Sequence, residues 1–277
     1  MFSIYNSIAL KQRPLVMGIL NVTPDSFFET GKSFFAESAF NHALEIESDG
    51  ADIIDIGGCS TSPGKSFASY EEELSRLKTV LPLIPNTVNI PVSIDTFRPE
   101  IAKFALENGV TIVNDESGVF SKEMASLVKA YNVNWIFMHT GNKTSSEIRE
   151  YKNGVVSDVL EFFKSMKEQA LNFGIKEENL CFDYGIGFGK TREDDLTLLQ
   201  NTSAFSDFKP LLVGVSNKRV VGQATEREVN DRLFGTVSAE SVSVFLGAGV
   251  IRTHNVKACV DVVNMVTSIK KGGFING

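Results

Sequence analysis

The chain has 277 residues and a formal net charge of −7, from 27 Lys and Arg against 34 Asp and Glu. No basic run is longer than two residues, as at Lys270-Lys271, so we expect neither nucleic acid nor an anionic membrane surface as a partner. Cys59, Cys181 and Cys259 lie too far apart for a disulfide framework or a zinc site. No stretch approaches the ~20 apolar residues of a membrane span, and no cleavable leader is recognisable, so we expect a cytoplasmic protein.

Eight short apolar runs follow one another along the chain, and each ends in a polar side chain. The first, Met17-Gly18-Ile19-Leu20, stops at Asn21 and passes into a loop marked by Pro24. Buried parallel strands have near-continuous apolar sequences, so each run predicts a strand. The runs with their polar ends cover residues 17–21, 53–58, 92–96, 112–115, 136–139, 181–185, 212–216 and 250–254.

Segments with helical periodicity separate these strands. Between them, apolar residues recur every three or four positions, as Val159, Phe163, Met166 and Ala170 do, which gives each predicted helix one apolar face. The predicted helices cover residues 36–48, 70–80, 100–106, 122–131, 155–173, 194–200, 229–246 and 256–268. The longest irregular pieces, 23–35, 59–69, 140–154 and 217–227, all follow strands and are the candidate substrate loops.

Strand and helix therefore alternate eight times within a length that suits one barrel of roughly 250 residues. We predict an α/β protein with a single (β/α)8 TIM barrel as one domain over 1–277, with its ligand site at the C-terminal ends of the strands. A doubly wound open sheet also alternates, but it is less expected to place polar strand ends so evenly around eight units.

Four polar residues at strand ends are candidates for binding a flat heterocycle. Asp95, Asn114 and Asp183 end the third, fourth and sixth predicted strands, and Lys218 follows the seventh. An Asp after a strand commonly caps the next helix, and this is the alternative for each one alone. Together, carboxylates and a carboxamide can accept from and donate to ring nitrogens, an exocyclic amine and a carbonyl, and the lysine adds a donor.

A second group, on the first and eighth strands, suits an anionic leaving group and its metal ion. Asn21, Arg252 and His254 offer a carboxamide, a cation and an imidazole on strands that become neighbours when a barrel closes. The two-residue spacing of Arg252 and His254 puts both on one face of a strand. We expect this group on the opposite side of the mouth from the heterocycle site.

The glycine-rich segment 185–191 matches neither common nucleotide-binding motif. A Walker A loop requires a glycine where Tyr184 stands, and Gly-x-Gly-x-x-Gly fails because Gly189 comes one residue too early. We interpret the segment as a flexible turn that lets a ligand approach the backbone. Because no Ser/His/Asp or Cys/His set stands at motif spacing, covalent catalysis is not expected, and Cys59 is interpreted as a lining residue.

Taken in order, these motifs resemble the dihydropteroate synthase family over essentially the whole chain. The resemblance rests on Asn21-Val22-Thr23-Pro24-Asp25-Ser26-Phe27, Asp55-Ile56-Gly57-Gly58, Ile94-Asp95-Thr96, Asn114-Asp115, Met138-His139, Asp183 with the segment 185–190, Ser216 with Lys218, and Arg252 with His254.

The resemblance implies that 6-hydroxymethyl-7,8-dihydropterin pyrophosphate condenses with p-aminobenzoate to give dihydropteroate and pyrophosphate. It implies substrate contacts from Asp95, Asn114, Asp183, Lys218, Met138, Thr61, Ser216, Phe188, Asp25 and Phe27. Asn21, Arg252, His254 and Lys218 would take part in catalysis, with Asn21 as a ligand of Mg2+. A homodimer and inhibition by sulfonamides, which mimic aminobenzoate, are also implied.

The chain departs from the family's usual sequence mainly on the aminobenzoate side. Cys59 stands for a Glu, Ser62 and Asn217 each stand for an Arg, and Tyr184 stands for a Pro. Two other functions therefore stay open at this point. One is a homologue that binds pterin without turning it over; the other, less favoured, is a pterin-dependent methyltransferase domain, which should lack the pyrophosphate residues Arg252 and His254.

Overall fold

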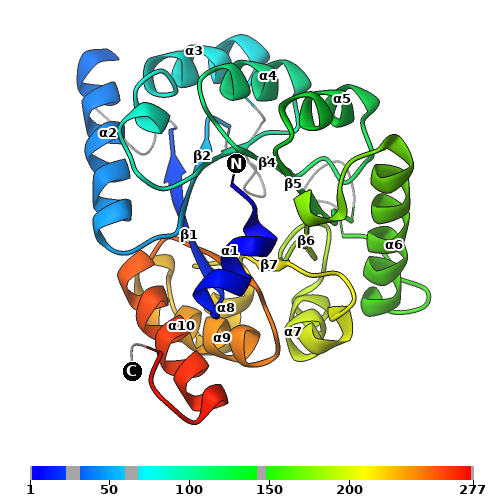
Figure 1. The fold of residues 1–277 in the computed structure, drawn as a ribbon. Coiled ribbons are helices and arrows are strands. Elements are labelled where there is room, and N and C mark those ends of the chain that lie inside the picture. Colours follow the sequence, from blue (N-terminus) through cyan, green and yellow to red (C-terminus); the bar gives the residue numbers. More distant parts are fainter. Residues whose placement is uncertain (1, 23–31, 60–67, 142–147, 276–277) are drawn as a thin grey trace.

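A closed ring of eight parallel strands forms the centre of the computed structural model, which describes residues 2–22, 32–59, 68–141 and 148–275 (Figure 1). The strands pair in chain order, and β1 closes the ring against β8, with Leu15 opposite Val250. They are β1 Leu15–Asn21, β2 Ile53–Gly57, β3 Val92–Asp95, β4 Ile112–Asp115, β5 Asn134–Met138, β6 Leu180–Asp183, β7 Leu211–Val213 and β8 Val250–Thr253. The predicted (β/α)8 barrel is confirmed.

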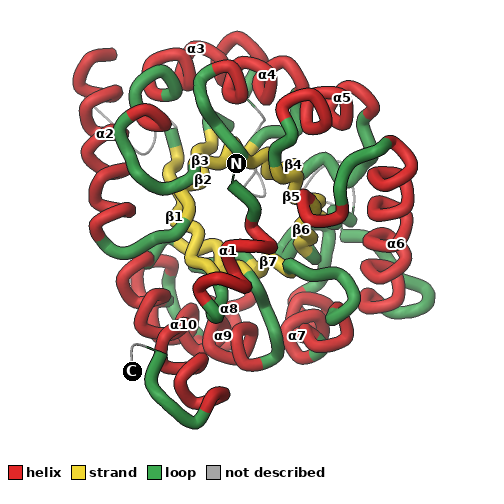
Figure 2. Tube along the Cα trace, in the orientation of Figure 1, coloured by secondary structure: helices red, strands yellow, loops and turns green. Residues whose placement is uncertain are grey.

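Helices surround the strands as an outer ring, as Figure 2 shows in red around yellow. They bury the apolar faces that the periodicity predicts; in α6, Val159, Phe163, Met166 and Ala170 are all buried. The helices after β1 are α2 Lys32–Ser48, α3 Tyr70–Val80, α4 Pro99–Glu107, α5 Lys122–Tyr131, α6 Val155–Phe173, α7 Arg192–Gln200, α8 Arg219–Thr225, α9 Leu233–Phe245 and α10 Val256–Lys271. None of the described helices has the length and apolar character needed to span a bilayer.

Helix α2 begins at Lys32, four residues earlier than predicted and inside the stretch 23–35 that was expected to be irregular. The largest differences from the predicted boundaries lie between β7 and β8. The segment 217–227, expected to be irregular, contains α8, which is too short to display a helical period in the sequence. The single helix expected over 229–246 is instead the 3-10 turn Val229–Asp231 followed by α9, with a break at Arg232. Arg232 donates from Nη1 to the Asn217 carbonyl (2.8 Å) and from Nε to the Arg227 carbonyl (3.1 Å), which ties the break to the loop after β7.

The N-terminal end of the barrel is covered by α1 (Ile4–Lys11), a helix that the sequence did not predict (Figure 1). Asn134 at the start of β5 accepts from the Ile4 backbone N–H at 3.1 Å and donates to the Phe2 carbonyl at 3.1 Å. Ile4 thereby joins a small apolar core inside the barrel, separate from the larger core under the outer helices. The inner core consists of Ile4, Leu15, Met17, Ile53, Ile112, Ile136, Cys181, Leu212 and Val250.

Successive side chains of a strand point alternately toward the barrel axis and toward the helices, and this decides which residues face the axis at the C-terminal end of the barrel. In β2, Ile53 belongs to the inner core, whereas Ile54 and Ile56 pack under the helices. Asp55 therefore points inward, above the inner core. The inner apolar layer closes one end of the barrel, and polar side chains at the C-terminal strand ends form the opposite mouth.

Candidate active site

A buried ion-pair cluster lies at the mouth of the barrel. Arg252 on β8 donates from Nε to Asp55 Oδ2 on β2 at 2.6 Å and from Nη2 to Asp95 Oδ2 on β3 at 2.7 Å. Asn114 on β4 donates from Nδ2 to the same Asp55 oxygen at 3.1 Å. Four strands thus contribute to one hydrogen-bonded group, which leaves the side-chain oxygen Oδ1 of Asn114 and the second Asp95 oxygen for a ligand.

Burial and neighbouring charges control the protonation of this cluster. Burial raises the pKa of Asp95 well above its ordinary value, and the negative charge of Glu116 adds to the effect against the attraction of Arg252. The carboxylates Asp55, Asp95 and Glu116 raise the pKa of Arg252 although burial opposes them, so this guanidinium stays charged. Glu116 lies in the turn directly after β4, where its charge acts on Asp95, Arg252 and Lys218.

The sequence prediction separated Arg252 from the heterocycle group, and this arrangement was wrong. Arg252 lies in direct contact with Asp95 rather than across the mouth from it, because closure of β8 on β1 brings it beside β2 and β3. Asn21 also lies on this side: the Cβ position of Gly57 is 3.7 Å from both Asn21 Oδ1 and Asp95 Oδ2. The two predicted groups therefore form one continuous site.

Asp183 and Lys218 are held by the loop that follows β6. The Gly185 backbone N–H donates to Asp183 Oδ1 at 2.7 Å, and Lys218 donates from Nζ to the Ile186 carbonyl at 2.7 Å. Nζ of Lys218 also lies 4.9 Å from the centre of the Phe188 ring. Burial raises the pKa of Asp183, and burial lowers that of Lys218. Two opposite charges are thus kept within one partly desolvated pocket.

A hydroxyl from the loop after β7 and an imidazole directly after β8 lie in contact. Ser216 Oγ accepts from the His254 backbone N–H at 3.1 Å and lies 3.1 Å from His254 Nδ1. Partial desolvation, together with the positive charges of Arg252 and Lys218, lowers the pKa of His254, which is exposed at the mouth. Met138, the other predicted contact, is buried at the end of β5 beside Gly185.

Four of the residues named from the sequence lie outside the described part of the chain, and a fifth, Cys59, lies at its edge. Asp25, Phe27, Thr61 and Ser62 fall outside the described residues. Cys59 is buried and its Sγ accepts from the Ala68 backbone N–H at 3.3 Å, while burial raises the pKa of its thiol, which suits a lining residue.

Tyr184 and Asn217, two departures from the family's usual sequence, have structural roles. Tyr184 turns away from the mouth into the outer core, where its hydroxyl lies 3.2 Å from Thr202 Oγ1. Asn217 has a φ of 57°, in the left-handed region that Asn adopts more readily than most residues. Its backbone N–H donates to Thr236 Oγ1 at 3.2 Å.

Sequence reasoning missed three charged residues of the mouth or of its supports. Asp55 belongs to one of the motifs but was not predicted as a site residue, although its place between Ile54 and Ile56 on an alternating strand already turns it inward. Glu116 lies in the turn after β4, beyond the reach of strand alternation, and its closeness to the mouth follows from the fold. Lys190 is fully buried and donates to three backbone carbonyls, an arrangement that no sequence pattern reveals.

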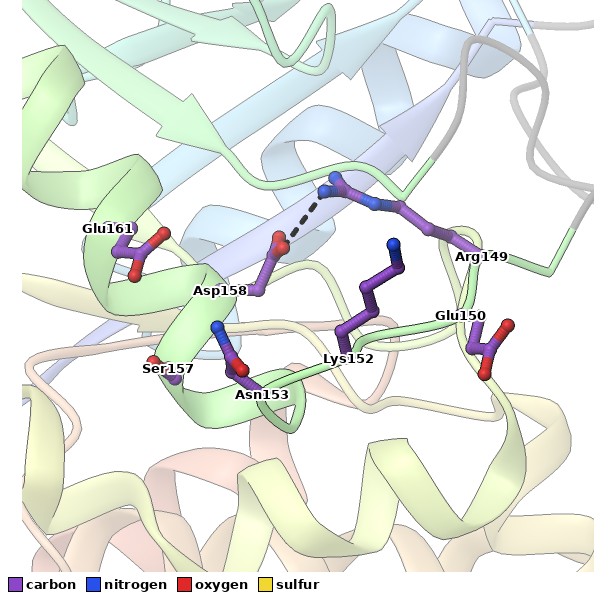
Figure 3. A pocket seen from close by; sticks show the side chains of 7 residues that line it. All are labelled: Arg149, Glu150, Lys152, Asn153, Ser157, Asp158 and Glu161. Atoms are coloured by element: carbon purple, nitrogen blue, oxygen red, sulfur yellow. Dashed lines mark hydrogen bonds and ion pairs between the residues drawn. The ribbon is translucent and has the colours of Figure 1, made fainter.

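A separate polar cavity of 320 Å³ lies beside the start of α6 (Figure 3). Asp158 accepts from Arg149 Nη2 at 2.9 Å and lies 3.0 Å from His139 Nε2. Burial lowers the pKa of His139 to about 3, so the neutral ring donates to Asp158 from Nε2. None of the predicted site residues lines this cavity, which is bounded by Arg149, Glu150, Lys152, Asn153, Ser157, Asp158 and Glu161.

Comparison of sequences gives matches over nearly the whole chain. Residues 17–254 match the model of the family described as pterin binding enzyme. A dihydropteroate synthase of Clostridium beijerinckii is 39% identical over 248 residues, covering 88% of this chain and 90% of that protein. The dihydropteroate synthase of Bacillus subtilis is 35% identical over 275 residues, with 98% and 94% covered.

Solved structures are similar over the same extent. A dihydropteroate synthase from Clostridium difficile in the presence of pteroic acid has a TM-score of 0.88 at 36% identity, covering 94% of this chain and 97% of that one. A Xanthomonas albilineans dihydropteroate synthase with 4-aminobenzoic acid has a TM-score of 0.87 at 34% identity, with 94% of both chains covered. A Yersinia pestis dihydropteroate synthase with a sulfonamide drug has a TM-score of 0.86 at 32% identity, covering 94% of this chain and 95% of that one.

Proposed function

Since this chain belongs to the pterin-binding enzyme family and, within it, to the dihydropteroate synthases, we propose how its own residues perform the condensation. The transferase reaction joins 6-hydroxymethyl-7,8-dihydropterin pyrophosphate to p-aminobenzoate. The bond from the pterin methylene to the pyrophosphate oxygen breaks, the methylene forms a bond to the arylamine nitrogen, and that nitrogen loses a proton. The observation that carries the proposal is the buried cluster of Asp55, Asp95, Asn114 and Arg252 at the barrel mouth.

Asp95, Asn114, Asp183 and Lys218 bind the pterin ring in this proposal. The free oxygens of Asp95, Asn114 and Asp183 accept from ring N–H and exocyclic amine groups, whereas Lys218 donates to a ring acceptor. Lys218 uses one of its three N–H donors on the Ile186 carbonyl, so two remain. Phe188, beside Lys218, gives the ring an aromatic neighbour.

Arg252, His254 and Asn21 receive the pyrophosphate. Arg252 uses Nε and Nη2 on carboxylates, and among the described residues its Nη1 has no acceptor, so it can donate to the departing oxyanion. Departure of pyrophosphate leaves a cationic methylene on the pterin, so no protein nucleophile is needed. Holding both reactants in line can supply ~7 to 11 kcal/mol of the barrier reduction.

We propose Mg2+ as the accompanying ion, bound mainly by the substrate. Within the described ranges no three His, Cys, Asp or Glu side chains converge to hold a metal ion. In this proposal the carboxamide oxygen of Asn21 would help to hold the ion beside the pyrophosphate, since Mg2+ prefers oxygen ligands. When bound, such an ion neutralises charge on the leaving group.

Release of pyrophosphate tests the function directly. Pyrophosphate should be released only with the pterin substrate, p-aminobenzoate and Mg2+ all present, and chelation of Mg2+ should stop it reversibly. A protein that binds the pterin normally but releases no pyrophosphate with both substrates present would be a non-catalytic pterin-binding homologue. Release that persists undiminished in a chelator would contradict the role of the ion.

Asp183→Asn should weaken pterin binding about tenfold to a hundredfold, because losing one charged hydrogen bond costs ~1.5 to 3 kcal/mol. The carboxamide oxygen of Asn can still accept from the Gly185 N–H, so the loop should keep its fold. Calorimetry with the pterin measures the change, and Asp207→Asn, an exposed Asp away from the strand ends, is the matched control. Unchanged pterin affinity in folded Asp183→Asn would contradict the assignment.

The affinity for p-aminobenzoate should rise when arginines replace Ser62 and Asn217, the two positions where the family usually has Arg. The double variant Ser62→Arg and Asn217→Arg should lower the Michaelis constant for p-aminobenzoate, leave that for the pterin substrate nearly unchanged, and strengthen sulfonamide binding. Arg at the left-handed position 217 should also reduce the stability of the fold by about 1 to 2 kcal/mol. Steady-state kinetics and thermal unfolding measure these effects, with each single variant as control. If the unmodified protein and the double variant have equal Michaelis constants for p-aminobenzoate, the two missing arginines do not weaken the binding of this substrate.

We propose a homodimer that uses the outer face of α9 and α10. These two helices pack against each other and expose apolar side chains that a second copy of the chain could cover. Val242, Phe245, Met265 and Ile269 are each at least half exposed. Light scattering should give twice the 30.4 kDa mass of the chain, and a monomer at micromolar concentration would contradict it. The three free buried thiols suit the cytoplasmic location that we propose for it.

A further inference from the structure

The segment 185–190 has a fixed and unusual backbone shape. Gly185, Gly187 and Gly189 have φ values of 65°, 82° and 63°, in the left-handed region that favours glycine. Gly185 is also in close contact with the end of β5, because a Cβ there would lie 2.1 Å from the His139 carbonyl oxygen. This glycine loop (residues 185–190) therefore has a shape that other residues would not adopt.

The ammonium group of Lys190 lies at the centre of the glycine loop. Its Nζ donates to the carbonyl oxygens of His139 at 3.1 Å, Gly185 at 2.9 Å and Phe188 at 3.0 Å. An ammonium group has three N–H donors, so every donor is used on a backbone carbonyl. The side chain is 1% exposed and makes no ion pair within 4.0 Å among the described residues. Lys190 thus acts inside the loop as a bound cation would.

The first residues of the glycine loop, together with Phe188, contact the residues that bind the pterin. The Gly185 N–H donates to Asp183, and the Ile186 carbonyl, one residue further, accepts from Lys218. Phe188, whose carbonyl is one of the three acceptors of Lys190, presents its ring to the Lys218 ammonium. The shape that Lys190 stabilises is therefore the shape that orients Asp183 and Lys218.

We propose that Lys190 is a positioning residue of the reaction. Its ammonium group holds the glycine loop in the one conformation in which Asp183 and Lys218 both face the pterin, and it does so without touching substrate. The inference rests on the proposed pterin site. It assigns to this lysine a different task from that of a nucleotide-binding lysine, because all its donors are turned to the protein's own backbone.

The surroundings of Lys190 make its ammonium group lose a proton more easily than an exposed lysine does. Burial lowers its pKa to about 7, partly offset by nearby carboxylates. The charged and titratable groups that face it come from β6, α7, the loop after β7 and the end of β5: Asp183, Asp194, Asp195, Lys218 and His139. As the pH rises through 7 the ammonium becomes an amine with two N–H donors, too few for three carbonyls, so the loop should lose its orientation above this pH.

Substitutions at Lys190 can distinguish a role in positioning the pterin-binding residues from a role in the stability of the fold. Lys190→Met should raise the Michaelis constant for the pterin substrate at least tenfold and change that for p-aminobenzoate much less. Lys190→Arg keeps the charge and enough donors, so it should restore most of the pterin affinity. Lys152→Met is the matched control: this exposed lysine of the Figure 3 cavity has no hydrogen bond or ion pair among the described residues, and its loss should change neither constant.

The pH dependence supplies a second readout that needs no disruptive variant. Pterin affinity of the unmodified protein, measured by calorimetry, should fall at least tenfold between pH 6.5 and 8.5. In Lys190→Arg, whose guanidinium keeps its proton, that decline should be largely absent. If Lys190→Met does not fold, the pH profiles of the unmodified protein and of Lys190→Arg still test the positioning role of Lys190.

The outcomes distinguish this inference from the function on which it rests. A flat pH profile in the unmodified protein, a profile that persists in folded Lys190→Arg, or unchanged pterin binding in folded Lys190→Met would overturn the role of Lys190. The absence of pyrophosphate release, with pterin binding that still responds to Lys190 as expected, would overturn the proposed turnover and leave the positioning role intact.

Discussion

The contact of Arg252 with Asp55 and Asp95 is the constraint on which the mouth of the barrel depends. Two carboxylates on the inner faces of neighbouring strands are expensive to bury without a positive partner, and removing one member of a buried pair commonly costs 3 to 5 kcal/mol. Arg252 donates to one oxygen of each carboxylate from a third strand. The polar mouth can therefore lie directly above an apolar inner core, so that a preformed set of donors and acceptors meets the ligand.

Strand ends could be predicted from the sequence because a buried parallel strand and the polar residue that follows it are local patterns. Asp95, Asn114, Asp183 and Lys218 were identified on that basis, and all four lie at one end of the barrel. The partnership of Arg252 with Asp95 could not be predicted in the same way. It depends on how β8 meets β1 and on the diameter of the closed ring, which are properties of the whole sheet.

The predictions that failed concern features whose cause is not local. Seven residues of α8 contain too few turns to show a period, and α1 is stabilised by contacts of Ile4 and Phe2 with Asn134, far along the chain. The flexibility of the glycine loop stays a prediction. The contacts of Lys190 with the loop could not be predicted, because only the fold brings the His139 carbonyl within its reach.

The position of Arg252 on the last strand has a consequence for synthesis. A chain leaving the ribosome presents β2 and β3, with Asp55 and Asp95, long before β8 is available, so a partly made barrel contains two inward carboxylates and no guanidinium to compensate them. Compact intermediates that lack β8 are therefore disfavoured by their own charges as well as by the unpaired edge of β1. The same arginine that shapes the mouth thus makes completion of the chain a condition for closing the barrel.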